Sequence, residues 1–231
     1  MYEKNIKDYD KICKIGKGAF SIVYKIEYNG NFYAAKTFFR SDGTTEEDQW
    51  DQVRISREIE ILTKFNHPTI ITFHGYSLID FDNEKNITLI MDWAANGSLY
   101  TYLEKVRKSF ESKYELNNTN RQIILIGIAR GMMFLHQNGI IHRDLKPENI
   151  LLDEHLRPHI TDFNLSKRVD PSDPNSQSLH DSTELYMSPE MIGKEDYDFK
   201  TDVYSFSLVM YEIVTNEIPK FPGDKTINNS I

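Results

Sequence analysis

The sequence predicts an α+β protein of two lobes, in which a strand-rich part precedes a mainly helical part. Before residue 93, short apolar runs alternate with turn residues, which is typical of strands. Helical sequence follows, with long apolar stretches at 121–137 and 201–215. Strands before the break and helices after it indicate a lobe boundary, so we assign residues 1–93 to the first lobe and 94–231 to the second.

Composition excludes several classes of protein. The 231 residues, of which 39% are hydrophobic and 27% charged, suffice for one large domain or two small lobes. A formal net charge of −8 argues against general binding of nucleic acid or anionic membranes, because both need a cationic surface. The single cysteine, Cys13, excludes an internal disulfide and a cysteine-based zinc cluster, and we interpret it as a small strand residue. The chain has no apolar signal core and no membrane-length apolar run, so we expect a cytoplasmic protein without a membrane span.

Two hairpins are predicted near the N-terminus. Asn29-Gly30 between two short strand-like runs is a strong hairpin signal. The hairpin before it contains Gly16 and Gly18, which would let exposed backbone N–H groups approach a ligand closely. A plain hairpin turn accounts for these two glycines equally well.

One lysine and one glutamate fall beside apolar faces. Lys36 lies inside the apolar strand run 32–39. Glu58 lies in a helix expected at 51–65, on or beside the face that Ile55 and Leu62 mark. A strand lysine is commonly on the solvent face, and a helix glutamate is commonly exposed. A buried glutamate would instead need a cationic partner, and Lys36 is a candidate.

The second half of the chain is predicted to contain two buried helices and a long loop. The stretches 121–137 and 201–215 are apolar on most sides, as expected of buried helices, and Asn138-Gly139 ends the first of them. Strand-like runs at 70–78, 86–92, 150–152 and 159–161 complete the expected elements. Residues 165–185 form a loop rich in Ser, Asp and Pro, long enough to indicate a function.

The densest charge of the chain lies between two apolar elements. His142, Arg143, Asp144 and Lys146 occupy five residues, and Asn149 follows. Charges between buried elements are costly unless they are paired. A polar turn is the plain alternative, but a turn does not need Asp, Lys and Asn at these offsets. The stretch resembles the catalytic loop of the protein kinase family, which reads His-Arg-Asp-Leu, three free positions and Asn.

The resemblance covers about residues 9 to 222. Several separate motifs appear in the family's order, so chance agreement is remote. They are Gly16-x-Gly18 with Ser21 at the third glycine position, Lys36, Glu58, Asp162-Phe163-Asn164 and Ser188-Pro189-Glu190. The resemblance implies the two-lobe protein kinase fold, with a small antiparallel β-sheet lobe that carries one helix and a mainly helical lobe. It also implies ATP and Mg²⁺ as cofactors and a protein as substrate.

The resemblance assigns a role to each matching residue. The expected ATP-binding residues are Ile15, Gly16, Gly18, Val23, Ala34, Lys36, Glu58, Asp92, Ala94 and Leu151, with Met91 as gatekeeper. Asp144 is expected as the base that orients the substrate hydroxyl, Lys146 as the charge that stabilises the moving phosphoryl group, and Thr183 as the support of Asp144. Asn149 and Asp162 match the Mg²⁺ ligands.

The expected activity is ATP-dependent phosphorylation of serine and threonine hydroxyls on protein substrates in intracellular signalling. Lys146 followed by Pro147-Glu148 looks like the serine/threonine form, and residues 202–207 resemble the tyrosine-kinase-like branch, in which Asp202 would anchor the catalytic loop. Arg143 suggests control by an upstream kinase that phosphorylates the activation loop. A solvated polar loop without regulation is the alternative. The candidate phosphate acceptors are Ser172, Ser176, Ser178 and Ser182.

Two departures from the family are apparent. Asn164 replaces a glycine of the family, whose backbone angles most residues avoid and which lets the segment flip. Asparagine tolerates positive φ better than other residues. We therefore expect that Mg²⁺ binding is retained and that the equilibrium between the inward and outward positions of this segment is altered. The chain ends at Ile231, before the family's last helices, so we expect an incomplete helical lobe and no family partner for Glu190. A fragment, a partner chain or a weakly folded lobe would each account for this end.

The alternative function is that of a pseudokinase, a nucleotide-binding or scaffolding module with little transfer activity. Asn164 and the missing helices favour it, whereas the retained Lys36, Glu58, Asp144 and Asp162 favour the enzyme. A P-loop NTPase is excluded because no Gly-x-x-x-x-Gly-Lys-Ser/Thr occurs. The seven histidines show no metal-ligand spacing, which argues against a metal hydrolase.

Overall fold

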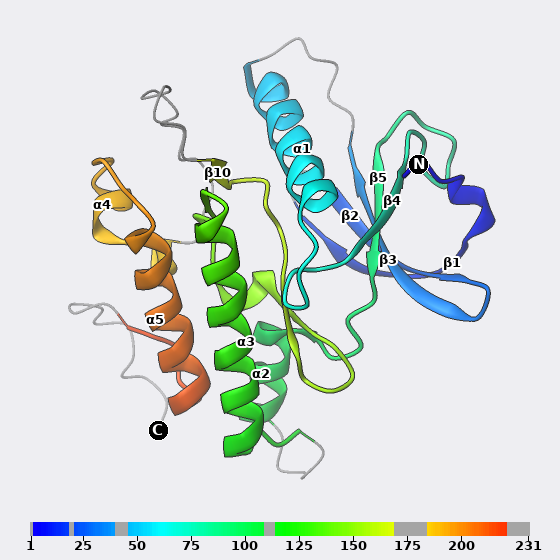
Figure 1. Ribbon diagram of the computed structural model, residues 1–231. Helices are drawn as coiled ribbons and strands as arrows, with labels where there is room; N and C mark the ends of the chain where they lie inside the picture. The colour runs from blue at the N-terminus through cyan, green and yellow to red at the C-terminus, as the bar shows by residue number, and fades with distance from the viewer. Residues whose placement is uncertain (1, 19–20, 40–45, 109–113, 169–183, 221–231) are drawn as a thin grey trace, which may run out of the picture.

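The computed structural model describes residues 2–18, 21–39, 46–108, 114–168 and 184–220, with the backbone alone described at 46–51 and 184. Within these residues the predicted α+β class with two lobes is confirmed: an antiparallel sheet with one long helix, followed by a mainly helical part (Figure 1). No helix in this part of the chain combines the length and the apolar character that crossing a membrane requires.

The sheet has five antiparallel strands in the order β1-β2-β3-β5-β4. The strands are β1 (Asp10–Lys17), β2 (Ser21–Tyr28), β3 (Asn31–Phe38), β4 (Phe73–Ser77) and β5 (Thr88–Asp92). The predicted turn at Asn29-Gly30 is confirmed, because Tyr28 pairs with Asn31. Asn29 and Gly30 have φ values of 51° and 75°, as a two-residue turn with the twist of a hairpin requires.

The first residues of the chain lie along the outer edge of the sheet. Tyr2 and Lys4 exchange backbone hydrogen bonds with Tyr76 of β4, at 2.9 and 2.8 Å. The short 3₁₀ helix η1 (Ile6–Asp8) follows, and Ile6 is fully buried against Ile26, together with two further residues of the sheet. The segment therefore covers an edge that would otherwise expose unpaired backbone groups.

Helix α1 (Glu46–Lys64) lies beside the sheet (Figure 1) and starts five residues before the predicted start at 51. The expectation was wrong there because Glu46-Glu47-Asp48 has no apolar periodicity, although acidic residues favour the first turn of a helix. Glu58 of this helix is fully buried, so its side chain faces the interior.

The predicted strand 70–78 is two separate pieces. Only 73–77 belongs to the sheet, as β4. The residues before it pair with another strand instead: Ile71 donates a backbone hydrogen bond to Ile160 at 3.0 Å, and Ile160 donates one to Thr69 at 2.8 Å. This pairing ties the chain between α1 and β4 to the strand that leads into Asp162. The strand predicted at 86–92 begins at Thr88.

The helical part contains three long helices with short strands and turns between them. Its elements are β6 (Gly97–Ser98), α2 (Leu99–Lys108), α3 (Asn118–Gln137), β7 (Ile140–Ile141), η2 (Pro147–Asn149), β8 (Ile150–Leu152), β9 (Pro158–Ile160), β10 (Lys167–Arg168), η3 (Glu184–Tyr186), α4 (Pro189–Ile192) and α5 (Lys200–Thr215). The predicted hairpin of β8 and β9 is present, with β6 on its other side, and β7 pairs with β10. Gly139 follows α3 with a φ of 73°, as its predicted terminating position requires.

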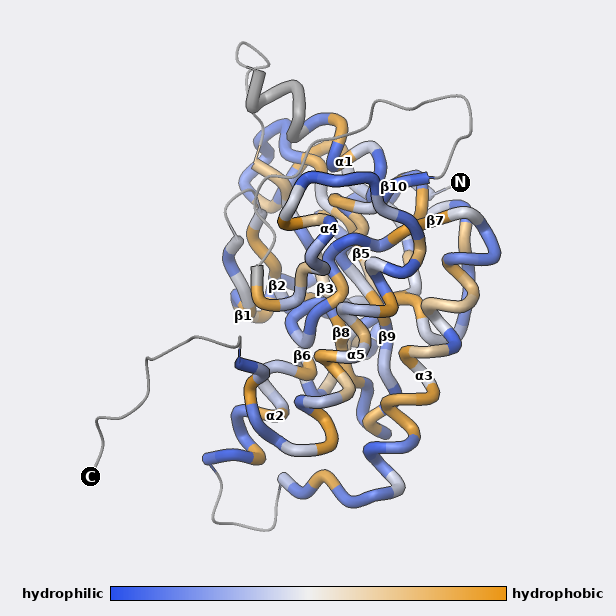
Figure 2. The backbone as a smooth tube through the Cα atoms, turned by 90° about the vertical axis from the view of Figure 1, so that its left-hand side faces the viewer, coloured by the Kyte–Doolittle hydropathy of each residue, from blue (hydrophilic) through white to orange (hydrophobic). Residues whose placement is uncertain are grey.

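The expectation that α3 and α5 are buried on most sides was wrong. Each helix packs one side into the core, through Ile128 and Leu135 on α3 and Val209 on α5, which are all buried. The opposite sides expose apolar residues that the rest of the described chain does not cover, and both helices carry long apolar stretches (Figure 2). These exposed residues are Ile123, Ile126 and Met133 on α3 and Val203, Met210, Tyr211 and Val214 on α5.

The core runs from the sheet into the helical part as one cluster of buried side chains, including Leu62, Leu89, Ile128 and Phe163. Helix α3 approaches β9 closely because Gly127 has no side chain. A Cβ atom there would lie 2.4 Å from Cγ of Pro158, a contact that real Cβ atoms essentially never make. The strand that ends just before Asp162 therefore depends on this glycine for its place.

We expect Gly127→Ala to destabilise the protein, by about 1–3 kcal/mol, because overpacking against the Pro158 ring forces the helix from the strand. In an unconstrained helix the same substitution would stabilise by roughly 0.5–1 kcal/mol, so the sign is diagnostic. Urea unfolding would measure the difference. Gln122→Ala, at an exposed position of the same helix, is the control and should change stability by less than about 0.5 kcal/mol. A stabilised Gly127→Ala variant would contradict the packing.

Candidate active site

The glycine hairpin brings four of the predicted ATP-binding residues to one end of the sheet. Gly16 of β1 lies opposite Val23 of β2, and the Gly18 N–H donates to the Ser21 carbonyl at 2.8 Å. A Cβ atom on Gly16 would meet no heavy atom nearer than 4.0 Å among the described residues. Packing among the described residues therefore does not require glycine here. Ile15 beside it is 44% exposed.

Three more of the predicted ATP-binding residues lie on β3 and at or just after the end of β5. Ala34 of β3 pairs with Met91, so this residue and the expected gatekeeper are neighbours in the sheet. Ala94 is buried, and its carbonyl accepts a hydrogen bond from Gly97 at 3.1 Å. The carboxylate of Asp92 contacts His74 at 2.5 Å. Burial alone would raise the pKa of Asp92, but hydrogen bonds from His74 and Thr72 hold it below its ordinary value.

Lys36, Glu58 and Asp162 form one cluster from three elements of the fold. The Lys36 Nζ lies 2.9 Å from Oε1 of Glu58 and 3.0 Å from Oδ1 of Asp162. Lys36 projects from β3, Glu58 from α1, and Asp162 follows β9. The expected pair of Lys36 and Glu58 is thus present, and the structure adds Asp162 as a second carboxylate on the same lysine.

The cluster carries one positive and two negative charges. Burial alone would lower the pKa of Lys36, but the charges of Asp162 and Glu58 overcome it and raise the pKa. Burial raises the pKa of Glu58, which has no exposed surface, while Lys36 opposes this. The pKa of Asp162 stays below its ordinary value despite burial, because Lys36 pairs with it. With all three groups ionised the net charge is −1, which favours a further cation.

The charged loop after β7 folds onto itself around Asp144. The Lys146 Nζ lies 3.0 Å from Oδ2 of Asp144, and the Asn149 amide donates to the same oxygen at 2.7 Å. Asn149 also donates to the Asp144 carbonyl at 2.8 Å. Burial raises the pKa of Asp144, while the Lys146 charge lowers it in part. The charge of Asp162 also raises this pKa. The segment of Asp162 is joined to this loop by the Thr161 N–H, which donates to the Asn149 carbonyl at 3.0 Å.

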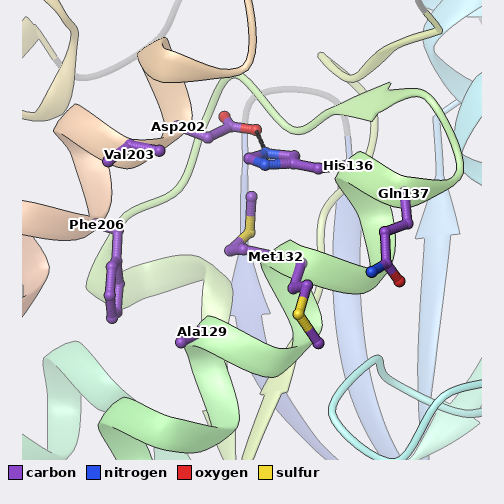
Figure 3. A pocket seen from close by; sticks show the side chains of 8 residues that line it. Ala129, Met132, His136, Gln137, Asp202, Val203 and Phe206 are labelled. Carbon is purple, nitrogen blue, oxygen red and sulfur yellow. Dashed lines mark hydrogen bonds and ion pairs between the residues drawn. The ribbon is translucent and has the colours of Figure 1, made fainter.

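Asp202 of α5 holds the backbone of this loop. Its carboxylate accepts the N–H groups of His142 and Arg143, each at 2.9 Å. His136 of α3 contacts the same carboxylate through Nε2 at 2.8 Å (Figure 3). Sequence reasoning expected the Asp202 contact to the loop but missed His136, which carries no signal beyond its place at the end of an apolar helix.

The backbone around Asp162 has its positive φ value at a different residue from the one that the asparagine at 164 suggested. Positive φ values of 66° occur at Arg143 and Asp162, whereas Asn164 is not among the residues of positive φ. The expected need for asparagine's tolerance of positive φ is therefore absent in this arrangement. Phe163 is fully buried, with its ring centroid 5.3 Å from that of His142. The Asn164 side-chain oxygen is buried and has no hydrogen-bond partner among the described residues.

Arg143 extends away from Asp144 towards two later segments. Its Nε donates to the Leu165 carbonyl, and its Nη1 donates to the Tyr197 hydroxyl at 2.6 Å. Sequence reasoning missed Tyr197, which lies 54 residues further along the chain. Leu151 of β8 pairs with His159. The predicted residues Thr183, Ser172, Ser176, Ser178 and Ser182 lie outside the described residues.

The residues around Asp162 fit a magnesium ion. The Asn149 amide nitrogen is used within the loop, so its oxygen remains the group that could bind a cation. The lowered pKa of Asp162 keeps its carboxylate ionised. Mg²⁺ is commonly held by one or two side-chain oxygens together with substrate phosphates. In the described part of the chain no group of three or more His, Cys, Asp or Glu could hold a metal alone.

A separate pocket of about 500 Å³ lies between α3 and α5, and Asp202 and His136 are among the residues that line it (Figure 3). Met132 and Met133 of α3 and Val203 and Phe206 of α5 give it a mostly apolar lining. None of the predicted nucleotide or metal residues lines it.

Comparison with known proteins gives the same family throughout. The family model of the protein kinase domain matches residues 9–231. A probable serine/threonine-protein kinase of Dictyostelium discoideum is 35% identical over 208 residues, which is 89% of this chain and 21% of that protein. The RAF proto-oncogene serine/threonine-protein kinase of Xenopus laevis is 35% identical over 211 residues, covering 89% of this chain and 30% of that protein. Ribosomal protein S6 kinase alpha-1 of Rattus norvegicus is 32% identical over 216 residues, which is 91% of this chain and 27% of that protein.

The chain thus spans less than a third of the length of each of these three relatives. The match nevertheless covers both the sheet and the helical part, and with them every cluster described above. The chain belongs to the protein kinase family.

Proposed function

We propose that this chain transfers the γ-phosphoryl group of ATP to serine or threonine hydroxyls of protein substrates. Two neighbouring charged clusters carry the proposal: Asp144 with Lys146 and Asn149, and Asp162 with Lys36 and Glu58. The backbone joins them, because the N–H of residue 161, next to Asp162, donates to the Asn149 carbonyl at 3.0 Å. Positioning and charge neutralisation are what phosphoryl transfer requires of a protein. The named serine/threonine kinases among the relatives support the class of substrate.

Each residue of the two clusters has a task in this proposal. Lys36, held by Glu58, binds the α- and β-phosphates, while the backbone of Gly16 and Gly18 covers them. Asp144 accepts the proton of the substrate hydroxyl and orients its oxygen. Lys146 stabilises the charge on the transferred phosphoryl group. Asn149 and Asp162 would hold Mg²⁺, which would supply positive charge to neutralise the phosphates.

The finer assignments remain proposals. Residues 1–93 form the nucleotide-binding lobe and 94–231 the catalytic lobe, and the protein belongs to the tyrosine-kinase-like branch and acts in cytoplasmic signalling. An upstream kinase phosphorylates one of Ser172, Ser176, Ser178 and Ser182. Arg143 supports this regulation, because two further cations, Arg57 and Lys167, lie nearby and add positive charge. Burial lowers the pKa of Arg57, and the charge of Arg143 lowers it further. The Lys167 ammonium lies beside the Tyr197 ring.

A pseudokinase is the second candidate, favoured by one observation. The buried side-chain oxygen of Asn164 without a partner weakens the segment that holds Asp162 in place. A chain in which this segment left its place would still offer a nucleotide-binding surface but would lack a metal ligand. Measured transfer activity separates the two candidates.

We expect Asp144→Asn to lower the rate of phosphate transfer from radiolabelled ATP to a protein substrate by about 10²–10⁴-fold, because the base is lost. Binding of ADP should change little, since Asp144 is not among the predicted nucleotide residues. Asp196→Asn, an exposed aspartate, is the matched control and should transfer at the native rate. Transfer that persists in Asp144→Asn, or absent transfer in the native chain, would contradict the enzyme proposal.

The activity should fall at low pH as Asp144 takes up a proton. Its pKa is raised by burial, so the acid limb of kcat/KM lies above the ordinary aspartate range near pH 4. Lys146 opposes this increase, so Lys146→Met should raise the pKa further and move the acid limb to higher pH. Lys200→Met, at an exposed lysine, should leave the limb unchanged. A limb that stays in place or moves to lower pH in Lys146→Met would refute the role of this pair.

We expect Asn164→Ala to raise the free energy of unfolding by about 1 kcal/mol, because it removes a buried acceptor that has no partner. Asn164→Asp has the same size but would place a charge near Asp162, so it should lower stability. Thermal unfolding with and without ADP and Mg²⁺ would measure both variants. Equal stabilities of the alanine and native proteins would mean that water satisfies this oxygen.

A further inference from the structure

Tyr197 occupies an unusual place between α4 and α5. Its ring is half-buried, whereas the aspartates on either side, Asp196 and Asp198, are exposed. The hydroxyl oxygen accepts a hydrogen bond from Nη1 of Arg143 at 2.6 Å. The tyrosine thus reaches from the segment before α5 to the residue next to the proposed catalytic base.

Arg143 is the point at which three segments meet. Its backbone N–H is held by Asp202, and its side chain, which is buried, donates to the Leu165 carbonyl and to Tyr197. Its backbone has a φ of 66°, a conformation that non-glycine residues adopt only where their surroundings impose it. A group that fixes the Arg143 side chain therefore helps to fix both Asp144 and the segment that follows Asp162.

The surroundings of this side chain are cationic. The Arg143 guanidinium lies 5.9 Å from the centre of the Tyr197 ring, and the Lys167 ammonium lies 5.5 Å from it. Arg57 of α1 is near enough for the Arg143 charge to lower its pKa, although burial contributes more. Among the described residues no carboxylate lies within ion-pair distance of Arg57, Arg143 or Lys167, so the phenol is the side chain that hydrogen-bonds Arg143.

We propose that Tyr197 is a positioning residue, which holds Arg143 in its bonded place when no phosphate is present on the activation loop. The proposal deepens the proposed function, on which its catalytic part rests. The phenol oxygen supplies the acceptor, and two cations lie within 6 Å of the ring centre, which is favourable for an aromatic face. Asp144 is consequently oriented before phosphorylation.

A phosphate would add to this contact and need not replace it. A guanidinium has five N–H donors, of which Leu165 and Tyr197 take one each. Within the described residues, no other hydrogen bond uses the remaining Arg143 side-chain donors, so with Arg57 and Lys167 they could bind an anion. Tyr197 therefore sets a basal arrangement that phosphorylation strengthens.

Tyr197→Phe tests the proposal, because it removes the hydroxyl and keeps the ring. Hydrogen–deuterium exchange of the full chain should show faster exchange in peptides covering 140–152 and 162–168. The control, Tyr211→Phe, removes an exposed hydroxyl on α5 that contacts Glu217 and should leave both regions unchanged. Arg143→Met should reproduce the exchange pattern of Tyr197→Phe. Unchanged exchange in Tyr197→Phe would overturn the proposal, and this readout does not require transfer activity.

Kinetics supply the second readout. In unphosphorylated protein, Tyr197→Phe should lower kcat about tenfold while the KM for ATP stays within about twofold, since a hydrogen bond to a charged group is lost near the base and not at the nucleotide. If Tyr197 acts through Arg143, adding Tyr197→Phe to Arg143→Met should cause no further loss. Additive losses would overturn the proposal. Absent transfer in the native chain would refute the proposed function, while the exchange experiment would still decide the role of Tyr197.

Discussion

The site depends most on the hydrogen bonds that the carboxylate of Asp202 accepts. This carboxylate is almost completely buried, where an unpaired charge would be very costly, and it is compensated by the N–H groups of His142 and Arg143 and by His136. The loop that bears Asp144 is thereby attached to α5, and through His136 to α3. Since Arg143 has a left-handed backbone, the loop would not hold this shape by local preference. The shape of the loop is imposed from the helical core.

The second half of the site is organised by a shared charge. Lys36 serves two carboxylates, and because only one positive charge is present, the buried Glu58 and the partly exposed Asp162 compete for it. Removal from water favours the neutral form of Glu58, whereas Asp162 remains ionised. A divalent cation beside Asp162 would relieve this competition. The arrangement that holds α1 against the sheet therefore also keeps the Asp162 carboxylate ionised.

The sequence predicts the parts of the site that local pattern or a family motif encodes, whereas other contacts between distant segments escape it. The hairpin at Asn29-Gly30 and the candidate pair of Lys36 and Glu58 follow from turn chemistry and from charges on apolar faces. The contacts of His136 with Asp202 and of Arg143 with Tyr197 join residues 66 and 54 positions apart, and no periodicity marks them. Helix burial was overestimated for a related reason, because an apolar stretch does not reveal which neighbours cover it. The strand predicted at 70–78 was divided because Ile70 and Ile71 pair with β9 instead.

The positive φ values show why the substitution at 164 does not prevent the observed arrangement. Strain in this segment falls on Asp162 itself, which Lys36 holds by its charge, and not on Asn164. An asparagine at 164 therefore fits without the freedom that glycine would give. Its cost lies in the side chain, whose buried oxygen has no partner, and this cost applies only while the segment keeps its present position. A movement of the segment that exposed this oxygen to water would remove the cost. We therefore expect Asn164 to lower the stability of the present position of this segment relative to positions in which its side chain meets water. The ion pair of Asp162 with Lys36 opposes that loss.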